Sequence, residues 1–196
     1  DMEGTLTPEI WEKIALNTGI EEFNKTTRDI PDYSELMDFR LRIMEKNNLK
    51  LSDIQKASSE LDLLPGAMNF LQKIRENFQV AILSDTFHEI AKPLMEKMGY
   101  PLLLCHNLEI DNDKVISYKL RHKKAKQQAI KGFQLMGYRC FAAGDSYNDI
   151  QMFEVAEKSF FINAPLKIAE AHPGIESFDN YLDLENALLK NSIFSS

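Results

Sequence analysis

Three short polar clusters along the chain carry the side chains that could do chemistry. They are DMEGT at residues 1–5, SDT at residues 84–86 and GDSYND at residues 144–149. Each cluster follows a short apolar run or stands where such a run would end. Because the carboxyl ends of parallel strands form the ligand crevice of open α/β sheets, we expect all three clusters to line one crevice. Carboxylates and hydroxyls gathered there would suit chemistry on a small ligand.

Taken singly, each cluster also has an ordinary structural interpretation. The first could be a turn, the second a helix N-cap, and the third an Asx-turn that leads into a helix. The three occur in this order, however, and a lysine lies in the predicted helix before the third cluster. This joint occurrence favours a catalytic site over three unrelated turns.

The elements that must position these clusters follow from hydrophobic periodicity. Helices are predicted at residues 8–17, 33–47 and 52–61. We expect Thr7 to cap the first of them, and a capping box at Ser52 and Gln55 to begin the third. The first sixty residues are therefore predicted to be a helical unit without a strand.

After residue 66 the pattern changes to helices that alternate with short apolar runs. Helices are expected at residues 67–76, 87–98, 123–136 and 150–157, and strands at residues 78–83, 102–105, 139–143 and 159–162. Residues 108–110 and 115–120 flank a turn-rich stretch and are expected to form a hairpin. The alternation indicates βαβ units around a parallel sheet, which is an α/β fold.

Composition limits the class of protein. The chain has 196 residues, and 23 basic against 30 acidic side chains give a formal net charge of −7. No apolar run approaches the ~20 residues that span a bilayer, and no basic stripe could neutralise a nucleic-acid backbone. We expect a cytoplasmic protein that binds neither membranes nor nucleic acid, with Cys105 and Cys140 as reduced core residues. Because the chain opens on Asp1, we also expect that an upstream segment has been trimmed.

The order of the motifs resembles one family. DMEGTL, VAILSDT, Lys126 and AAGDSYND are similar to the four motifs of the haloacid dehalogenase superfamily of phosphotransferases, over nearly the whole chain. The resemblance is closest to its phosphoserine phosphatase branch, and there to the variant that also transfers a phosphoryl group to homoserine. Asp-x-Glu, Ser-Asp-Thr and the stretch TTRDIPDY at residues 26–33 point to that variant.

The resemblance implies a Rossmann-like, doubly wound parallel sheet with a small helical cap subdomain. Residues 1–7 and 66–196 would form the core, and residues 8–65 the cap. It also implies Mg²⁺, which cancels repulsion between a carboxylate nucleophile and a phosphate dianion. The implied metal-site residues are Asp1, Asp145, Glu3 through its backbone carbonyl, and Asp149, which is better placed to orient the ligands.

The resemblance further assigns roles in phosphoryl transfer. Asp1 would be the nucleophile that forms an aspartyl-phosphate, and Glu3 the general acid and base. Lys126 would neutralise charge on the phosphoryl oxygens, with the neighbouring cations of residues 121–124 as competitors. Ser84 would donate its hydroxyl to the phosphoryl group, helped by the backbone N–H groups of residues 85 and 86 (Asp85 and Thr86) at the start of a helix.

Substrate choice is expected to depend on the helical segment. The helical neighbours of Arg40 are all apolar, namely Leu36, Met37, Ile43 and Met44. A guanidinium on an apolar face needs an anion, which a substrate carboxylate or a structural ion pair would supply. The family's carboxylate-binding arginine falls at this position, and the resemblance assigns Glu9 to the substrate ammonium. Asn148 would contact the substrate or cap a helix.

The expected function is Mg²⁺-dependent hydrolysis of O-phospho-L-serine, with phosphoryl transfer to L-homoserine as an added option. One alternative is the same chemistry on another small phosphorylated metabolite. A less favoured alternative is a receiver-like phospho-accepting module, which would hold its acceptor aspartate in mid-chain and lack a helical cap. The expected partner is therefore a small molecule, and a homodimer stays open.

Overall fold

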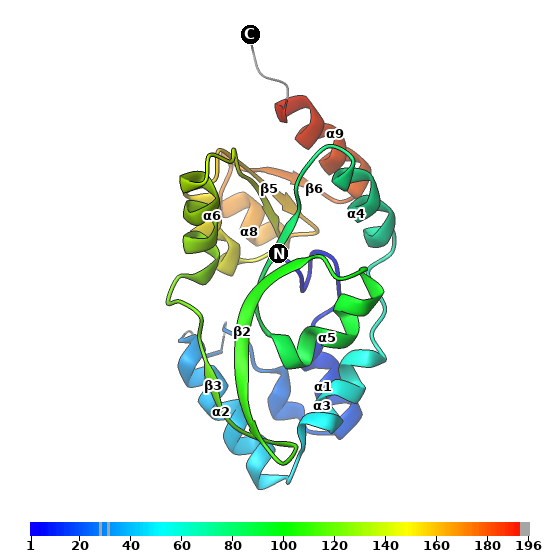
Figure 1. Cartoon of the computed structure of the whole chain (residues 1–196), viewed down its shortest axis with the longest axis vertical. Coiled ribbons are helices and arrows are strands. Elements are labelled where there is room, and N and C mark those ends of the chain that lie inside the picture. The colour runs from blue at the N-terminus through cyan, green and yellow to red at the C-terminus, as the bar shows by residue number, and fades with distance from the viewer. Residues whose placement is uncertain (28, 31, 193–196) are drawn as a thin grey trace.

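Two three-stranded sheets lie at the centre of the structure, a computed structural model that describes residues 1–27, 29–30 and 32–192 (Figure 1). Their orders are β1-β2-β3 and β4-β5-β6, and every pairing is parallel except that of β2 with β3. The strands are β1 (Ala81–Phe87), β2 (Leu102–Asp111), β3 (Lys114–Lys119), β4 (Phe141–Gly144), β5 (Lys158–Ile162) and β6 (Glu176–Phe178). The N-terminal residues lie between the sheets, where the Asp1 nitrogen donates to the Ala143 carbonyl at 2.8 Å.

Helices cover both faces of the second sheet. The helices are α1 (Ile10–Thr18), α2 (Tyr33–Lys46), α3 (Leu51–Ser59), α4 (Ala67–Arg75), α5 (His88–Lys97), α6 (Ala125–Leu135), α7 (Ile150–Phe153), α8 (Leu166–Ala171) and α9 (Tyr181–Ser192), with 3-10 turns at Glu21–Asn24 and Tyr147–Asp149. Side chains alternate along β5, so Phe160 belongs to the core cluster of α9 while Phe161 belongs to that of α6, α7 and α8. This arrangement confirms the predicted doubly wound α/β fold.

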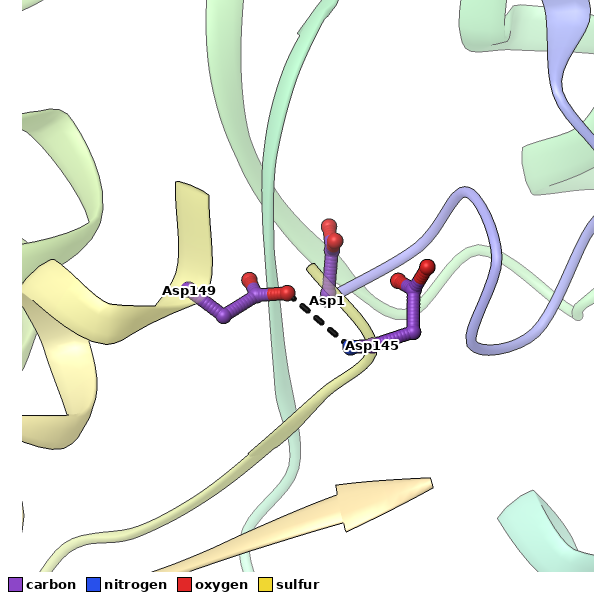
Figure 2. A group of neighbouring side chains, drawn as sticks. All are labelled: Asp1, Asp145 and Asp149. Carbon is purple, nitrogen blue, oxygen red and sulfur yellow. Dashed lines mark hydrogen bonds between the residues drawn. The ribbon is translucent and has the colours of Figure 1, made fainter. Parts of the chain in front are cut away.

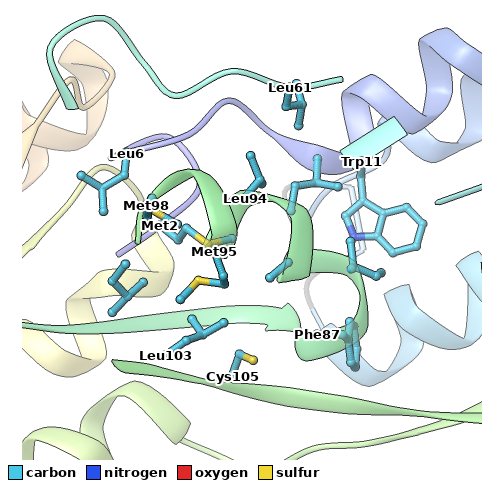
Figure 3. Close-up of a cluster of buried hydrophobic side chains, with 14 of the residues drawn as sticks. Met2, Leu6, Trp11, Leu61, Phe87, Leu94, Met95, Met98, Leu103 and Cys105 are labelled. Carbon is cyan, nitrogen blue, oxygen red and sulfur yellow. The ribbon is translucent and has the colours of Figure 1, made fainter. Parts of the chain in front are cut away.

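The helical unit of the first sixty residues packs directly on the sheet region. One cluster of buried apolar side chains runs from α1 through α5 to β2, and includes Trp11, Leu94 and Leu103 (Figure 3). Polar contacts reinforce it, since the Ser58 hydroxyl of α3 donates to the Ile90 carbonyl of α5 at 2.7 Å. The contacts extend to the hairpin of β2 and β3, whose Asp113 carbonyl accepts from the Leu51 N–H at 2.8 Å. The division of the chain into core and cap stays a prediction.

Two predicted helix starts are wrong, because the side chains expected to cap them bind other partners. Helix α1 is preceded by Glu9 rather than by Thr7, whose hydroxyl instead donates to the Met2 carbonyl at 3.4 Å. The capping box at Ser52 and Gln55 does not form. The Ser52 hydroxyl donates to Asp113 at 2.6 Å, and the Gln55 amide donates to a carbonyl of α5 at 2.9 Å. At Ser52 and Gln55 a tertiary partner thus replaces the local one, whereas Thr7 binds within its own loop.

The most consequential correction concerns residues 84–86, which were predicted to follow a strand and to begin a helix. Strand β1 continues through them to Phe87, and α5 begins only at His88. Phe87 pairs with His106 after an irregularity in register that starts at Leu83. Long β2 likewise joins the two short apolar runs predicted at residues 102–105 and 108–110.

Other differences are smaller. Helices α6 and α7 are shorter than predicted, and residues 163–192 contain α8, β6 and α9, for which no element was predicted. Both cysteines are buried and free, as expected. Within the described ranges no helix is long and apolar enough to cross a membrane. Arg28 and Pro31, in the stretch at residues 26–33, lie outside the described residues.

The fold requires a glycine at position 144, at the end of β4, and this requirement can be tested. A Cβ atom at this position would collide with the carboxylate of buried Asp149. Because the surroundings are close-packed, Gly144→Ala should lower the free energy of unfolding by about 1–3 kcal/mol. Urea unfolding measures the change.

The matched control is Gly132→Ala in α6, where an added Cβ meets no atom within 4 Å. This change should raise the free energy of unfolding by about 0.5–1 kcal/mol, because alanine favours the helix. Equal effects of the two substitutions would contradict the close approach of β4 to Asp149.

Candidate active site

Three carboxylates meet between the two sheets. Ligand oxygens of Asp1, Asp145 and Asp149 all lie within 4.8 Å of one another, and Figure 2 shows the first two side chains pointing the same way. Asp149 is fully buried, and its Oδ2 accepts from the backbone N–H groups of Asp145 at 3.0 Å and Ser146 at 3.1 Å. The turn after β4 is therefore wrapped around one carboxylate, which fixes Asp145 beside Asp1.

The buried ammonium of Lys126 joins two of these carboxylates. Its Nζ lies 2.8 Å from Oδ1 of Asp1 and 2.8 Å from Oδ1 of Asp149. Burial disfavours the charged form, yet the negative charges of Asp149 and Asp85 outweigh burial and hold the pKa of Lys126 above its usual value. Lys126 is thus a permanent cation beside Asp1, from the first turn of α6 as the sequence predicted.

Asp145 lacks such a cationic contact, and its surroundings favour a bound cation. Burial, followed by repulsion from Asp149, raises the pKa of Asp145 to about 7. Its Oδ1 accepts from the Thr5 hydroxyl at 3.4 Å. Gly4, with a φ of +74°, lets the N-terminal loop approach so closely that any Cβ there would collide with the Asp145 carboxylate. Carboxylate oxygens that crowd and repel in this way form a donor set typical of Mg²⁺.

The second polar cluster lies at the end of β1, opposite these carboxylates. Ser84 and Thr86 are both buried, and the Thr86 N–H donates to the Ser84 hydroxyl at 3.2 Å. Because the strand continues to Phe87, the amides of Asp85 and Thr86 lie ahead of α5 and not in its first turn. The expected contribution of a helix N-terminus at these amides is therefore wrong. The Thr86 hydroxyl has no hydrogen-bond partner in the part of the chain that the structure describes.

A pocket of about 180 Å³ connects these groups. Most of the predicted site residues line it, namely Asp1, Glu3, Glu9, Arg40, Ser84, Asp85, Thr86, Lys126 and Asn148. Asp145 and Asp149 are not among the lining residues but flank Asp1 behind it. The structure thus brings together residues from opposite ends of the chain and from the helical unit.

Arg40 supplies positive charge at the far side of this pocket. Its guanidinium lies 4.2 Å from the ring centroid of Trp11, and Nη2 donates to the Lys25 carbonyl at 3.0 Å. The side chain is buried, and its Nε has no hydrogen-bond partner among the described residues. Within those residues Arg40 makes no ion pair within 4.0 Å. It is therefore a cation in apolar surroundings that could bind an anionic ligand.

Glu3 and Glu9 form a second acidic group near Arg40. Oε2 of Glu3 accepts from the Ile10 N–H at 3.2 Å, and the two carboxyls lie against each other. Burial raises the pKa of Glu3, and burial together with the charge of Glu3 raises the pKa of Glu9 to about 8. The pair therefore retains a proton at neutral pH, which is the property of a general acid.

Two residues at this site, Trp11 and His106, belong to none of the motifs. In the sequence Trp11 is one of the apolar residues of a predicted helix, and His106 stands alone beside Cys105. Nε2 of His106 lies 3.6 Å from Oδ1 of Asp85, and its ring is buried. The available signal was weak, since His106 is a single polar side chain directly after a predicted apolar strand.

The chain is similar to known proteins in sequence and in fold. Residues 1–157 match the family model of haloacid dehalogenase-like hydrolases. Among curated proteins, the chain is 48% identical over 193 residues to phosphoserine phosphatase ThrH of Pseudomonas aeruginosa, covering 98% of this chain and 94% of that protein. It is 47% identical over 193 residues to a phosphoserine phosphatase of Pseudomonas syringae pv. tomato, covering 98% of this chain and 81% of that protein.

Solved structures agree at the level of the fold. A substrate-bound phosphoserine phosphatase complex superposes with a TM-score of 0.75 at 19% identity, covering 92% of this chain and 91% of that one. The phosphoserine phosphatase from T. onnurineus gives a TM-score of 0.71 at 23% identity, covering 95% of this chain and 90% of the other. Together with the family model and the near-complete curated relatives, these similarities show that the chain belongs to the haloacid dehalogenase-like hydrolases.

Proposed function

We propose that this hydrolase cleaves O-phospho-L-serine into L-serine and phosphate through an aspartyl-phosphate on Asp1. One observation carries the proposal: the Asp1 carboxylate lies in a pocket 2.8 Å from the Lys126 ammonium, and the pocket also holds a buried arginine. A nucleophile, a phosphate-neutralising cation and a carboxylate-binding cation are thus present together. The curated relatives that are named phosphoserine phosphatases support the choice of substrate.

The chemistry of the proposed step starts at Asp1. Its carboxylate oxygen attacks phosphorus, and the bond between phosphorus and the serine oxygen breaks. Lys126 and the Ser84 hydroxyl stabilise the charge on the phosphoryl oxygens. Glu3, whose pKa is raised by burial, gives its proton to the departing serine oxygen. In the second step Glu3 takes a proton from the attacking water, and phosphate leaves from Asp1.

Mg²⁺ is the cation that the acidic cluster suits. Asp1 and Asp145 would hold it with the Glu3 backbone carbonyl, while Asp149 keeps Asp145 in position through the backbone contacts described above. When bound, the ion reduces the repulsion between the Asp1 carboxylate and the phosphate dianion.

The helical segment would act as a cap that selects the substrate. Arg40 would pair with the substrate carboxylate, because its guanidinium is buried, faces the pocket and has an Nε without a hydrogen-bond partner among the described residues. Glu9 would receive the ammonium, as the resemblance implies, and Asn148 would contact the substrate or its phosphate. An L-homoserine molecule that replaces water in the second step would leave as phosphohomoserine. That second activity is supported by the Asp-x-Glu, Ser-Asp-Thr and TTRDIPDY motifs, which resemble those of the homoserine-transferring variant.

The nucleophile is tested by Asp1→Asn. The amide keeps the shape of the side chain but cannot form the acyl phosphate, so kcat for phosphate release should fall by more than about 1,000-fold. Thermal unfolding monitors the fold. Asp62→Asn, at a side chain that is 93% exposed, serves as the surface control. Turnover by Asp1→Asn near the control's rate would exclude Asp1 as nucleophile.

Metal removal tests the acidic cluster. With excess chelator, phosphate release from O-phospho-L-serine should fall to background, because the crowded carboxylates then repel the substrate dianion. Added Mg²⁺ should restore the rate. Each assay is repeated with L-homoserine present, and phosphohomoserine is measured. Undiminished release in chelator would rule out the metal-dependent mechanism, and absence of phosphohomoserine would restrict the acceptor to water.

The carboxylate subsite is tested by Arg40→Ala. Loss of the buried guanidinium should weaken binding of O-phospho-L-serine by about 2–5 kcal/mol, the usual cost of leaving a charged partner unpaired. The measured quantity is KM, with kcat as the comparison. Arg42→Ala removes an exposed cation two residues along the same helix and should leave KM unchanged. If KM is equally unaffected in Arg40→Ala, Arg40 has only a structural role.

A further inference from the structure

We infer that Tyr181, the first residue of α9, is a positioning residue that holds the N-terminal loop, residues 2–7, in the conformation needed for cation binding at Asp145. This inference rests on the proposed function and adds to it a residue from outside the four motifs. Helix α9 also lies outside residues 1–157, the part of the chain that the family model matches. The supporting observations are two hydrogen bonds at Thr5, the packing of the tyrosine ring, and the close approach of the loop to Asp145.

Thr5 is held through both its main chain and its side chain. The Tyr181 hydroxyl donates a hydrogen bond to the Thr5 carbonyl at 2.7 Å, across 176 positions of the chain. The Thr5 hydroxyl in turn donates to Oδ1 of Asp145 at 3.4 Å. Thr5 is only 4% exposed, so little water can replace either contact. One residue of the loop therefore joins α9 to a carboxylate of the acidic cluster.

The ring of Tyr181 has a fixed place against α4, which lies beside α9 (Figure 1). It stacks on Phe70, with 4.9 Å between the ring centroids and 20° between the planes. Gly66 leaves room for the ring, since a Cβ atom there would lie 3.3 Å from its Cδ2. The Asn180 side chain caps α9 by accepting from the Asp183 N–H at 2.9 Å. Burial raises the pKa of Tyr181 to about 12, so a fixed hydroxyl retains the proton that it donates.

The N-terminal loop is closed by its own hydrogen bonds and anchored by others. The N–H groups of Leu6 and Thr7 both donate to the Met2 carbonyl, at 2.7 and 3.0 Å. These bonds set the shape of the loop but not its place in the fold. From outside the loop, the Leu64 N–H donates to the Leu6 carbonyl at 2.9 Å, and Tyr181 holds the residue before it. The Tyr181 contact therefore helps to set where the turn of the loop lies.

The place of this loop matters for the proposed cation site. A Cβ atom at Gly4 would lie only 2.2 Å from Oδ2 of Asp145, so the main chain of the loop lies directly against that carboxylate. The carbonyl of Glu3, the residue before Gly4, is the proposed main-chain ligand. Because Mg²⁺ requires near-ideal octahedral geometry, a small displacement of these groups would weaken its binding. Release of the Thr5 carbonyl by Tyr181 should therefore be measurable as a loss of Mg²⁺ affinity.

Tyr181→Phe tests the inference, because it removes the hydroxyl and keeps the ring that stacks on Phe70. We expect the dissociation constant for Mg²⁺, measured by calorimetry on the metal-free protein, to rise by roughly 3- to 10-fold. Amide hydrogen exchange of Leu6 and Thr7 in the metal-free protein should accelerate by a similar factor. At saturating Mg²⁺ the KM for O-phospho-L-serine should keep its wild-type value, because the pocket residues are unchanged.

Tyr118→Phe is the matched control, because the Tyr118 hydroxyl also donates to a backbone carbonyl, that of Ser34 in α2, at 3.0 Å. This variant should lose stability but keep the wild-type Mg²⁺ affinity and loop exchange. Wild-type values of both quantities in Tyr181→Phe would overturn the inference, and so would equal losses of Mg²⁺ affinity in the two variants. A wild-type protein that binds Mg²⁺ but releases no phosphate would instead contradict the proposed function, while the binding and exchange measurements still decide the role of Tyr181.

Discussion

The contact of one buried ammonium with two carboxylates is the interaction on which the site depends. Lys126 lies 2.8 Å from both Asp1 and Asp149, and Asp149 in turn holds the turn that carries Asp145. Without the lysine, buried carboxylates at this spacing would take up protons rather than stay charged. With it, the charged form of the Asp1 carboxylate is favoured, which is the form that the proposed attack on phosphorus requires. Lys126 therefore stabilises the two buried carboxylates of the folded protein, and in the proposed reaction it would also neutralise phosphate.

Around that contact the fold requires glycine at two positions. Gly4 and Gly144 are needed because carboxylates occupy the space that a Cβ atom would take. The N-terminal loop, the end of β4 and the start of α6 can then converge between two sheets that, in the described part of the chain, share no strand pairing with each other. The helical unit closes the other side through α2, which brings Arg40 and Tyr33 to the same pocket. In the proposed reaction, chemistry and selectivity would thus come from different parts of the chain.

Much of this arrangement could be predicted from the sequence, because it depends on periodicity and on motif order. The α/β alternation, the buried Arg40 on an apolar helix face and the position of Lys126 follow from local patterns. The course of the chain at residues 84–86 does not, because Phe87 finds a partner in β2 that lies far away in sequence. For the same reason the contacts of His106 could not be predicted. Its partners come from β1, α2 and the segment before α6.

The central claim is that a phosphoryl group passes through Asp1. The direct measurement is to mix the protein with O-phospho-L-serine and Mg²⁺, quench in acid, and map the phosphorylated residue by mass spectrometry. The account predicts phosphate on the peptide that contains Asp1, in an acyl linkage that hydroxylamine removes. Phosphate on Ser84, or steady turnover with no phosphorylated residue at any time, would contradict it.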